Sequence, residues 1–246
     1  LMTLLIDADY LIYSSCAAAD KHIKWDLHTW TSYSDERDIM QIIESRLEHY
    51  HKIVEEKHDI VMCFSSYPTF RHEIFPEYKL NRINKPKPFG LKAAINTVKK
   101  EYDSVFYDNL EGDDVLGLCA TNGKYKDPII VSVDKDMRTI PCKLLAADDL
   151  ELVTRKKADR QWMIQSLSGD PTDNYKGLDK VGVVTADKII GDAKTTEDMW
   201  NKVVAAYEKK GQTVGDAILT ARLARILREG DYDYNTGEVK LWNPKF

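Results

Sequence analysis

Short apolar runs and amphipathic segments alternate along the first part of the chain. Apolar, β-branched runs are typical of buried strands, and they occur at residues 3–7, 59–64, 104–107 and 129–133. Apolar positions at helical spacing predict helices after residue 8, at 36–57 and at 91–102. Weaker runs predict edge strands at 144–145 and 151–153. Strands and helices that alternate in this order predict a mainly parallel, doubly wound α/β sheet.

The pattern changes at about residue 159, beyond which strand signals disappear and helical spacing dominates. We therefore expect an α/β domain at residues 1–158 and a helical subdomain at 159–246, without a flexible linker between them. Residues 25–35 are polar, aromatic and irregular, so they predict either a hairpin or a loop.

Three carboxylates, Glu111, Asp113 and Asp114, directly precede an apolar run that reads as a buried helix. Carboxylates this close repel one another, and an ordinary fold gains nothing from the crowding. One acid would already satisfy the helix dipole, which is worth about 0.3–1 kcal/mol in the first turn. Three acids exceed that need, and they indicate a site for a cation.

Further acids stand where predicted strands end. Asp7 follows the first strand, and Asp134 and Asp136 follow the strand at 129–133. Open α/β sheets place their sites at the carboxyl ends of their strands. Asp7 taken alone fits a helix N-cap equally well. Together with the three acids at 111–114, these residues predict a site for a hard metal ion.

The net charge of −5 does not exclude a nucleic-acid partner, because the acids are grouped. If metal ions neutralise that group, the remaining surface is mildly basic. No apolar run approaches the roughly 20 residues needed to span a membrane, and we expect no signal peptide. The four cysteines lack metal-ligand spacing, which suits reduced thiols in a cytoplasmic protein.

A basic and aromatic segment occupies residues 69–88. Basic side chains bind phosphates and aromatic rings stack on bases, so the composition suits a contact with a single strand or with a strand end. A solvated loop would show the same composition. The candidate DNA contacts here are Arg71, Tyr78, Lys79, Arg82, Lys85 and Lys87.

Residues 168–186 form the second informative stretch. Asp170 and Asp173 are three residues apart, so a helical turn would direct both carboxylates one way. Gly177 and Gly182 flank a predicted short hairpin that contains Lys180, and a helix begins at residue 183. Backbone N–H groups at such a turn can hold a phosphate oxygen, and its carbonyls can hold a monovalent cation such as K⁺. A helix-hairpin-helix of this form reads duplex backbone, although a plain helix–turn–helix connection is the alternative.

These motifs, in this order and spacing, resemble the PIN-like 5′→3′ exonuclease and flap endonuclease family, including its stand-alone exonucleases from short-tailed coliphages. The resemblance rests on Asp7 after a strand, Phe-Arg followed by Pro-Glu-Tyr-Lys-x-Asn-Arg, EGDD, DKD and the glycine-containing stretch. It covers essentially the whole chain. It implies a PIN-like nuclease domain at 1–158 with a short basic arch at about 71–91, and a DNA-binding helix-hairpin-helix within 159–246.

The resemblance also implies roles for individual residues. Lys79 and Arg82 match the basic positions at the base of the family's arch, where they would hold and polarise the scissile phosphate. Two neighbouring Mg²⁺ ions, for which Mn²⁺ can substitute, would be bound by Asp7, Glu111, Asp113, Asp114, Asp134, Asp136, Asp170 and Asp173.

Two features depart from the family pattern. The loop after the strand at 59–64 carries Ser65 and Ser66 where the family places an Asp. The arch segment, at 83–91, is short. The first departure bears on metal affinity, and the second bears on whether a single-stranded flap threads through the protein.

We therefore expect a Mg²⁺-dependent 5′→3′ DNA exonuclease, with flap endonuclease and RNase H-like activity as further expectations. Its substrate would be duplex DNA with a 5′ end or flap, or an RNA/DNA hybrid, in phage-type DNA replication or degradation in a bacterial cytoplasm. Two alternatives stay open. A phosphatase could use Asp134 and Asp136 with one Mg²⁺, and a DNA-binding protein could retain the fold with a weakened site.

Overall fold

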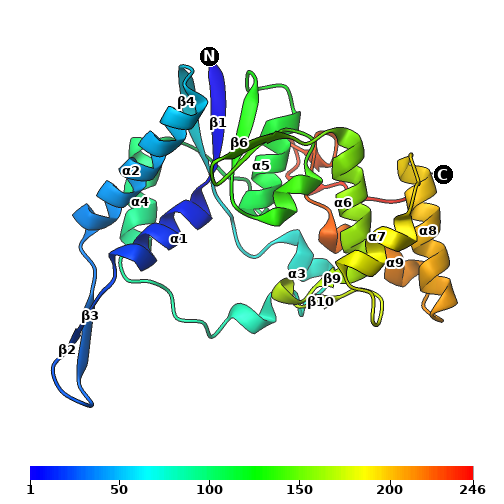
Figure 1. Cartoon of the computed structure of the whole chain (residues 1–246), viewed down its shortest axis with the longest axis horizontal. Helices are drawn as coiled ribbons and strands as arrows, with labels where there is room; N and C mark the ends of the chain where they lie inside the picture. The colour runs from blue at the N-terminus through cyan, green and yellow to red at the C-terminus, as the bar shows by residue number, and fades with distance from the viewer. Residues whose placement is uncertain (246) are drawn as a thin grey trace.

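A computed structural model, which describes residues 1–245, has a six-stranded sheet at its centre (Figure 1). All neighbouring strands are parallel except the last pair, which forms an antiparallel edge. The mainly parallel α/β sheet predicted from the sequence is therefore confirmed. In spatial order the strands are β5 (Asp103–Val105), β4 (His58–Cys63), β1 (Met2–Asp7), β6 (Pro128–Val131), β7 (Lys143–Ala146) and β8 (Asp149–Leu152).

Helices cover both faces of the sheet (Figure 1). Side chains alternate between the faces of a strand, so Leu4 and Ile6 of β1 point to one side and Leu5 to the other. The first side packs against α1 (Ala8–Ala19), α2 (Glu36–Val54) and α4 (Leu91–Glu101), and the second against α5 (Gly112–Thr121). Burial on both faces explains why these strands read as continuous apolar runs.

Four helices form a second core beside the sheet. Trp162, Met199, Val203 and Ala217 are buried at their contacts. The helices are α6 (Arg155–Ser168), α7 (Val183–Ile190), α8 (Thr196–Lys209) and α9 (Val214–Ala224).

The chain does not remain in the helical part to its end. Ile226, Leu227 and Tyr232 return to the sheet and pack in the same core as α5, next to the short pair β11 (Tyr232–Asp233) and β12 (Glu238–Val239). The predicted boundary at residue 158 lies inside α6. The division into residues 1–158 and 159–246 therefore stays a prediction.

Short elements complete the described chain. Residues 21–33 form a hairpin, β2 (Lys21–Lys24) and β3 (Trp30–Tyr33), which decides between the two alternatives for this region. A two-residue ladder, β9 (Gly169–Asp170) and β10 (Tyr175–Lys176), lies beyond residue 159, where no strand was expected, because two residues leave no periodic pattern. The remaining elements are α3 (Phe70–Ile74) and the 3₁₀ turns η1 (Leu80–Arg82), η2 (Lys135–Thr139) and η3 (Pro171–Asp173).

None of the helices within residues 1–245 combines the length and the apolar character that crossing a membrane requires.

Candidate active site

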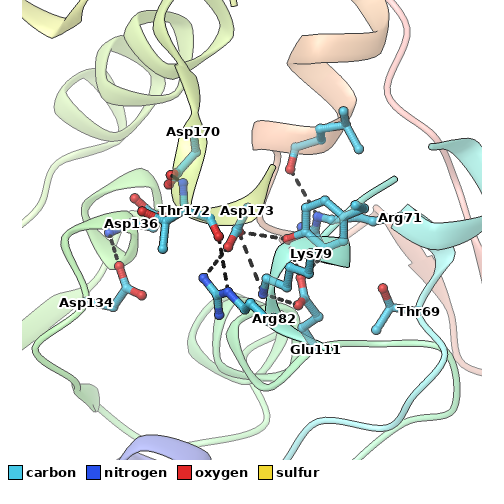
Figure 2. A network of polar contacts seen from close by, with 12 residues as sticks. Thr69, Arg71, Lys79, Arg82, Glu111, Asp134, Asp136, Asp170, Thr172 and Asp173 are labelled. Atoms are coloured by element: carbon cyan, nitrogen blue, oxygen red, sulfur yellow. Dashed lines mark hydrogen bonds and ion pairs between the residues drawn. The ribbon is translucent and has the colours of Figure 1, made fainter. Parts of the chain in front are cut away.

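The carboxyl ends of β1 and β6 open into a pocket of about 240 Å³. The first turn of α5 and the turns η2 and η3 complete its walls. Figure 2 shows Lys79 and Arg82 directed at Glu111 and Asp173, with Asp134 and Asp136 on the opposite side. Eight carboxylates and three basic side chains line the pocket, namely Asp7, Asp9, Glu111, Asp113, Asp134, Asp136, Asp170 and Asp173 with Lys79, Arg82 and Lys135.

Asp7 both caps a helix and lines the pocket, so the structure is compatible with both interpretations of its position, as an N-cap and as a site residue. Its Oδ1 accepts a hydrogen bond of 3.1 Å from the Tyr10 backbone N–H, so it caps α1. Its Oδ2 accepts one of 2.8 Å from the Ser132 hydroxyl and lies at the pocket wall. Burial raises the pKa of Asp7 to about 6.

Asp134 and Asp136 follow β6, as the sequence predicts. Asp134 caps η2, and its Oδ1 accepts a hydrogen bond of 2.8 Å from the Asp136 backbone N–H. Gln165 of α6 donates to Asp136 Oδ1 at 2.5 Å, which ties the helical part of the chain to the site. Burial, with repulsion from Asp134 and Asp170, raises the pKa of Asp136 to about 7.

The three acids at the start of α5 point in different directions. Asp113 faces the pocket, where burial and the nearby Asp7 raise its pKa well above the usual range. Glu111 also lines the pocket; burial opposes its ionisation, but the charges of Lys79 and Arg71 outweigh burial and hold the pKa of Glu111 below its usual value. Asp114 is fully buried and does not line the pocket.

Arg71 explains the orientation of Asp114. Its guanidinium donates to both carboxylate oxygens of Asp114, at 2.5 and 2.9 Å, and to Glu111 at 3.0 Å. The Leu227 backbone N–H donates to Asp114 as well, at 3.1 Å. With 2% of its surface exposed, Arg71 cannot reach DNA, so the predicted DNA contact is wrong. The basic residue instead neutralises buried acids and fixes the returning C-terminal segment.

Tyr78 is also placed differently from its predicted role. Its ring is buried, and its hydroxyl lies 2.9 Å from both Glu111 Oε2 and Asp173 Oδ2. A buried ring cannot stack on a DNA base, so this prediction is corrected. Tyr78 joins two acids of the pocket wall, a role that composition alone does not reveal.

Lys79 and Arg82 connect the basic segment to η3. Lys79 Nζ bonds to Glu111 and lies 3.7 Å from Asp173, while Arg82 Nη2 lies 2.5 Å from Asp173. Burial opposes the charge on Lys79, yet Glu111 and Asp173 raise its pKa above the ordinary value. The Lys79 backbone has φ of 55°, and its N–H donates to the Asp173 carbonyl at 2.9 Å. Those contacts hold a conformation that non-glycine residues rarely adopt.

Lys85 and Lys87 lie outside the pocket. Both side chains are exposed, on the segment between η1 and α4. No helix occurs at residues 84–90, which belong to the described part of the chain, so the arch segment is an irregular connection with turns at both ends. The two lysines stay predicted DNA contacts.

The glycine-containing stretch connects α6 to α7. Gly177 lies where a Cβ atom would come within 2.1 Å of the Leu167 carbonyl oxygen, so its lack of a side chain serves backbone packing. Residues 178–180 form a turn, and exposed Lys180 has φ of 58°. Gly182 is the N-cap residue of α7, with open space around it. This arrangement leaves the helix start and Lys180 accessible, and binding of duplex backbone there stays a prediction.

The pocket suits a hard divalent ion, because such ions prefer oxygen ligands. Its candidate ligands are carboxylate oxygens, and neither His nor Cys lines it. Within residues 1–245, however, no three His, Cys, Asp or Glu side chains are already arranged to hold one ion. Lys79 and Arg82 occupy oxygens of Glu111 and Asp173, while Ser132 and Gln165 occupy others. Metal binding would therefore require these side chains to exchange partners.

Asp9 is the pocket acid that sequence reasoning missed. It lies in the first turn of α1, where an acid is ordinarily explained by the helix dipole. The available signal was its spacing from Asp7, two residues earlier and at the same strand end. Burial raises the pKa of Asp9, as it does for the acids that were predicted.

An α/β sheet with acids and cations gathered at its carboxyl edge has its candidate site where open α/β sheets bind ligands. Similarity to known proteins identifies the family. Residues 2–166 match the family model of the 5′-3′ exonuclease N-terminal resolvase-like domain. The chain therefore belongs to this family of 5′-3′ exonucleases, and the predicted family and enzyme class are confirmed.

Relatives and solved structures agree with this assignment. The exodeoxyribonuclease of Enterobacteria phage T3 is 29% identical, with 98% of this chain and 93% of the relative covered. The exonuclease of Escherichia phage T7 is 28% identical over the same shares. The bacteriophage T5 D15 protein co-crystallized with metal ions shares the fold, with a TM-score of 0.62, 14% identity and coverage of 91% of this chain and 89% of that one.

Replacing Arg71 with Met should lower the free energy of unfolding by about 3–5 kcal/mol, because Asp114 and Glu111 would lose a buried partner. Urea denaturation measures the change. Arg138, whose exposed side chain pairs with Glu151 at 2.7 Å, provides the matched control. Arg138→Met should cost no more than about 1 kcal/mol. If both variants lost the same free energy of unfolding, the buried ion pairs of Arg71 would stabilise the fold no more than an exposed ion pair does.

The metal-free protein should become less stable as the pH rises from about 4 to about 7. The pKa values of Asp7 and Asp136, about 6 and about 7, lie above the ordinary 3.8. The folded chain therefore binds more protons than the unfolded chain in this range, and the free energy of unfolding falls with pH. Melting curves in EDTA should show the fall, and Asp136→Asn should reduce it. If Asp136→Asn kept the pH profile of the parent, Asp136 would not be a cause of the fall in stability.

Proposed function

We propose that this chain hydrolyses phosphodiester bonds near the 5′ ends of DNA, with flap endonuclease and RNase H-like activity on related substrates. The observation that carries the proposal is the convergence of eight carboxylates with Lys79 and Arg82 in one pocket, in a chain of the 5′-3′ exonuclease family. The phage exonucleases of T3 and T7 support DNA as the substrate class. They also support action during phage DNA replication or degradation in the cytoplasm of a bacterial host.

Two Mg²⁺ ions, replaceable by Mn²⁺, are the proposed cofactors. When bound, the ions would neutralise the carboxylates and polarise the phosphate ester. The structure of the T5 5′-exonuclease with bound divalent metal ions (zinc) supports a divalent cofactor. Asp114 is left out of the proposed ligand set, because its oxygens face Arg71 and Leu227. The proposed ligands are Asp7, Glu111, Asp113, Asp134, Asp136, Asp170 and Asp173.

Lys79 and Arg82 are proposed to bind the scissile phosphate. Their charges neutralise Glu111 and Asp173, with which they form ion pairs. Once cations satisfy those carboxylates, the two side chains become free to turn to the phosphate. Their charge would then stabilise the negative charge that develops as the ester bond breaks.

Duplex DNA is proposed to lie between the basic segment and the α6–α7 connection. Lys85, Lys87 and Lys180 are exposed and would contact phosphates, while backbone N–H groups after Gly182 would bind a phosphate at the start of α7. A K⁺ ion held by carbonyls of the same turn belongs to this proposal. An RNA/DNA hybrid is a further proposed substrate, because it also presents backbone phosphates to these contacts.

Incubation with a duplex that carries a labelled 5′ phosphate, in Mg²⁺, tests the proposed function. Release of labelled nucleotides supports a 5′→3′ exonuclease. Release of free phosphate would instead favour the phosphatase alternative, and binding without any product would favour a DNA-binding protein with a weakened site. Asp113→Asn, which removes a pocket acid but keeps its size, is the control and should be inactive.

Lys79→Ala should reduce turnover by about 10²-fold or more while DNA affinity changes little, because its charge matters most in the transition state. Single-turnover rates at saturating enzyme separate these two effects. Lys79→Arg should retain part of the rate, since the positive charge persists. If Lys79→Ala weakens binding but leaves the single-turnover rate unchanged, the role assigned to Lys79 is wrong.

Lys180→Ala should weaken duplex binding to the same degree for all sequences, and should reduce the slope of log affinity against log salt by about one unit. Fluorescence anisotropy with Ca²⁺ in place of Mg²⁺ measures binding without cleavage. Lys126→Ala, at an exposed position before β6, is the control and should leave the salt slope unchanged. An unaltered slope in Lys180→Ala would place the duplex elsewhere.

A further inference from the structure

Asp9 lies beside the end of β4, an inner strand that leads to no acid of its own in the pocket. β1 ends at Asp7 and β6 leads to Asp134, whereas β4, the other neighbour of β1, leads to Ser65 and Ser66. Asp9 comes from the first turn of α1, and its carboxylate lies against this serine loop. Its Oδ2 accepts a hydrogen bond of 2.9 Å from the Ser65 backbone N–H.

Three elements are built around the Asp9 carboxylate. The Ser65 hydroxyl accepts a hydrogen bond of 2.7 Å from the Gly112 backbone N–H, so the serine loop is joined to α5. A Cβ atom at Gly112 would come within 3.0 Å of Asp9 Oδ2. The absence of a side chain at 112 therefore leaves the space that the carboxylate occupies. Both Asp9 and Ser65 line the pocket.

A structural role explains this carboxylate only in part, because an acid in the first turn of α1 gains about 0.3–1 kcal/mol from the helix dipole. Within residues 1–245, Asp9 forms no ion pair, and its hydrogen bonds come from Ser65, whose backbone N–H donates at 2.9 Å and whose hydroxyl also contributes. The charge of Lys99 offsets burial only in part, because the pKa of Asp9 stays raised. The amide of an asparagine would accept the hydrogen bond from the Ser65 N–H equally well, without placing a negative charge among seven other pocket acids. Holding such a charge in a half-buried position without an ion pair is costly. The arrangement is therefore explained better by a ligand that the carboxylate binds.

We propose that Asp9 is a metal-binding residue of the pocket and supplies the carboxylate that the loop after β4 lacks. Ser65 is a positioning residue, because its backbone N–H holds Asp9 Oδ2 and so fixes the carboxylate at the pocket wall. The inference rests on the proposed divalent metal at this site. It adds a ligand from α1 to those from the strand ends and α5.

Asp9→Asn tests this inference, because it removes the charge but keeps the acceptor for Ser65. Melting temperatures are measured in EDTA and across titrations with Mg²⁺ and Mn²⁺, without DNA. We expect Asp9→Asn to melt higher than the parent in EDTA, since a repelling charge is gone. The metal-dependent rise should be smaller, and the Mg²⁺ concentration that gives half of it should increase about tenfold. Asp59→Asn, at an exposed acid of β4, should behave as the parent.

Each outcome decides between the two roles. A parent that does not respond to Mg²⁺ or Mn²⁺ contradicts the proposed metal site, and this inference with it. A parent that responds, with an Asp9→Asn variant that responds identically, overturns only the role of Asp9 and assigns it to the serine loop. Should Asp9→Asn fold poorly, Asp9→Ser combined with isothermal titration of Mn²⁺ gives the same comparison, with weaker Mn²⁺ binding expected and parent-like binding as the contrary result.

Discussion

Repulsion between carboxylates in one pocket is the constraint on which the rest of the site depends. Eight acids meet there, and burial raises the pKa of Asp7, Asp113 and Asp136 because water cannot stabilise their charges. The chain meets this constraint with internal cations. Lys79 and Arg71 neutralise Glu111, whose pKa is lowered in spite of its burial. The fold of the segments that carry these cations is thereby coupled to the charge state of the site.

The same ion pairs connect parts of the chain that are far apart in sequence. Arg71 joins α3 to α5 through Asp114, and Asp114 in turn accepts a hydrogen bond from the backbone of the returning C-terminal segment. Lys79 and Arg82 join the basic segment to η3. Two neighbouring acids of the first α5 turn thus face in different directions. Asp113 lines the pocket, and Asp114 faces the buried contacts with Arg71 and Leu227. The buried pair around Asp114 gives the pocket wall its fixed position.

The sequence could predict the sheet and the position of most acids, because both follow local rules. Apolar runs identify β1, β4 and β6, and strand ends in a parallel sheet share one edge. The orientation of individual side chains could not be predicted in this way. Arg71 and Tyr78 belong to a basic, aromatic segment that suits DNA binding, yet both are buried. Their burial results from partners on α5 and η3, 40 and 95 residues away along the chain, respectively.

Asp9 illustrates the same limit in the opposite way, because it lines the pocket although it was not predicted as a site residue. A single acid in the first turn of a helix has an ordinary explanation in the helix dipole, so the spacing of Asp9 from Asp7 is only a weak signal for a site. Only the tertiary structure shows that α1 directs this carboxylate to the loop after β4, where Gly112 leaves room for it. A helix can therefore place an acid beside a strand end that has none, as α1 does beside the loop after β4. The number of acids around a pocket depends on the elements that converge there, and each strand end need not carry its own.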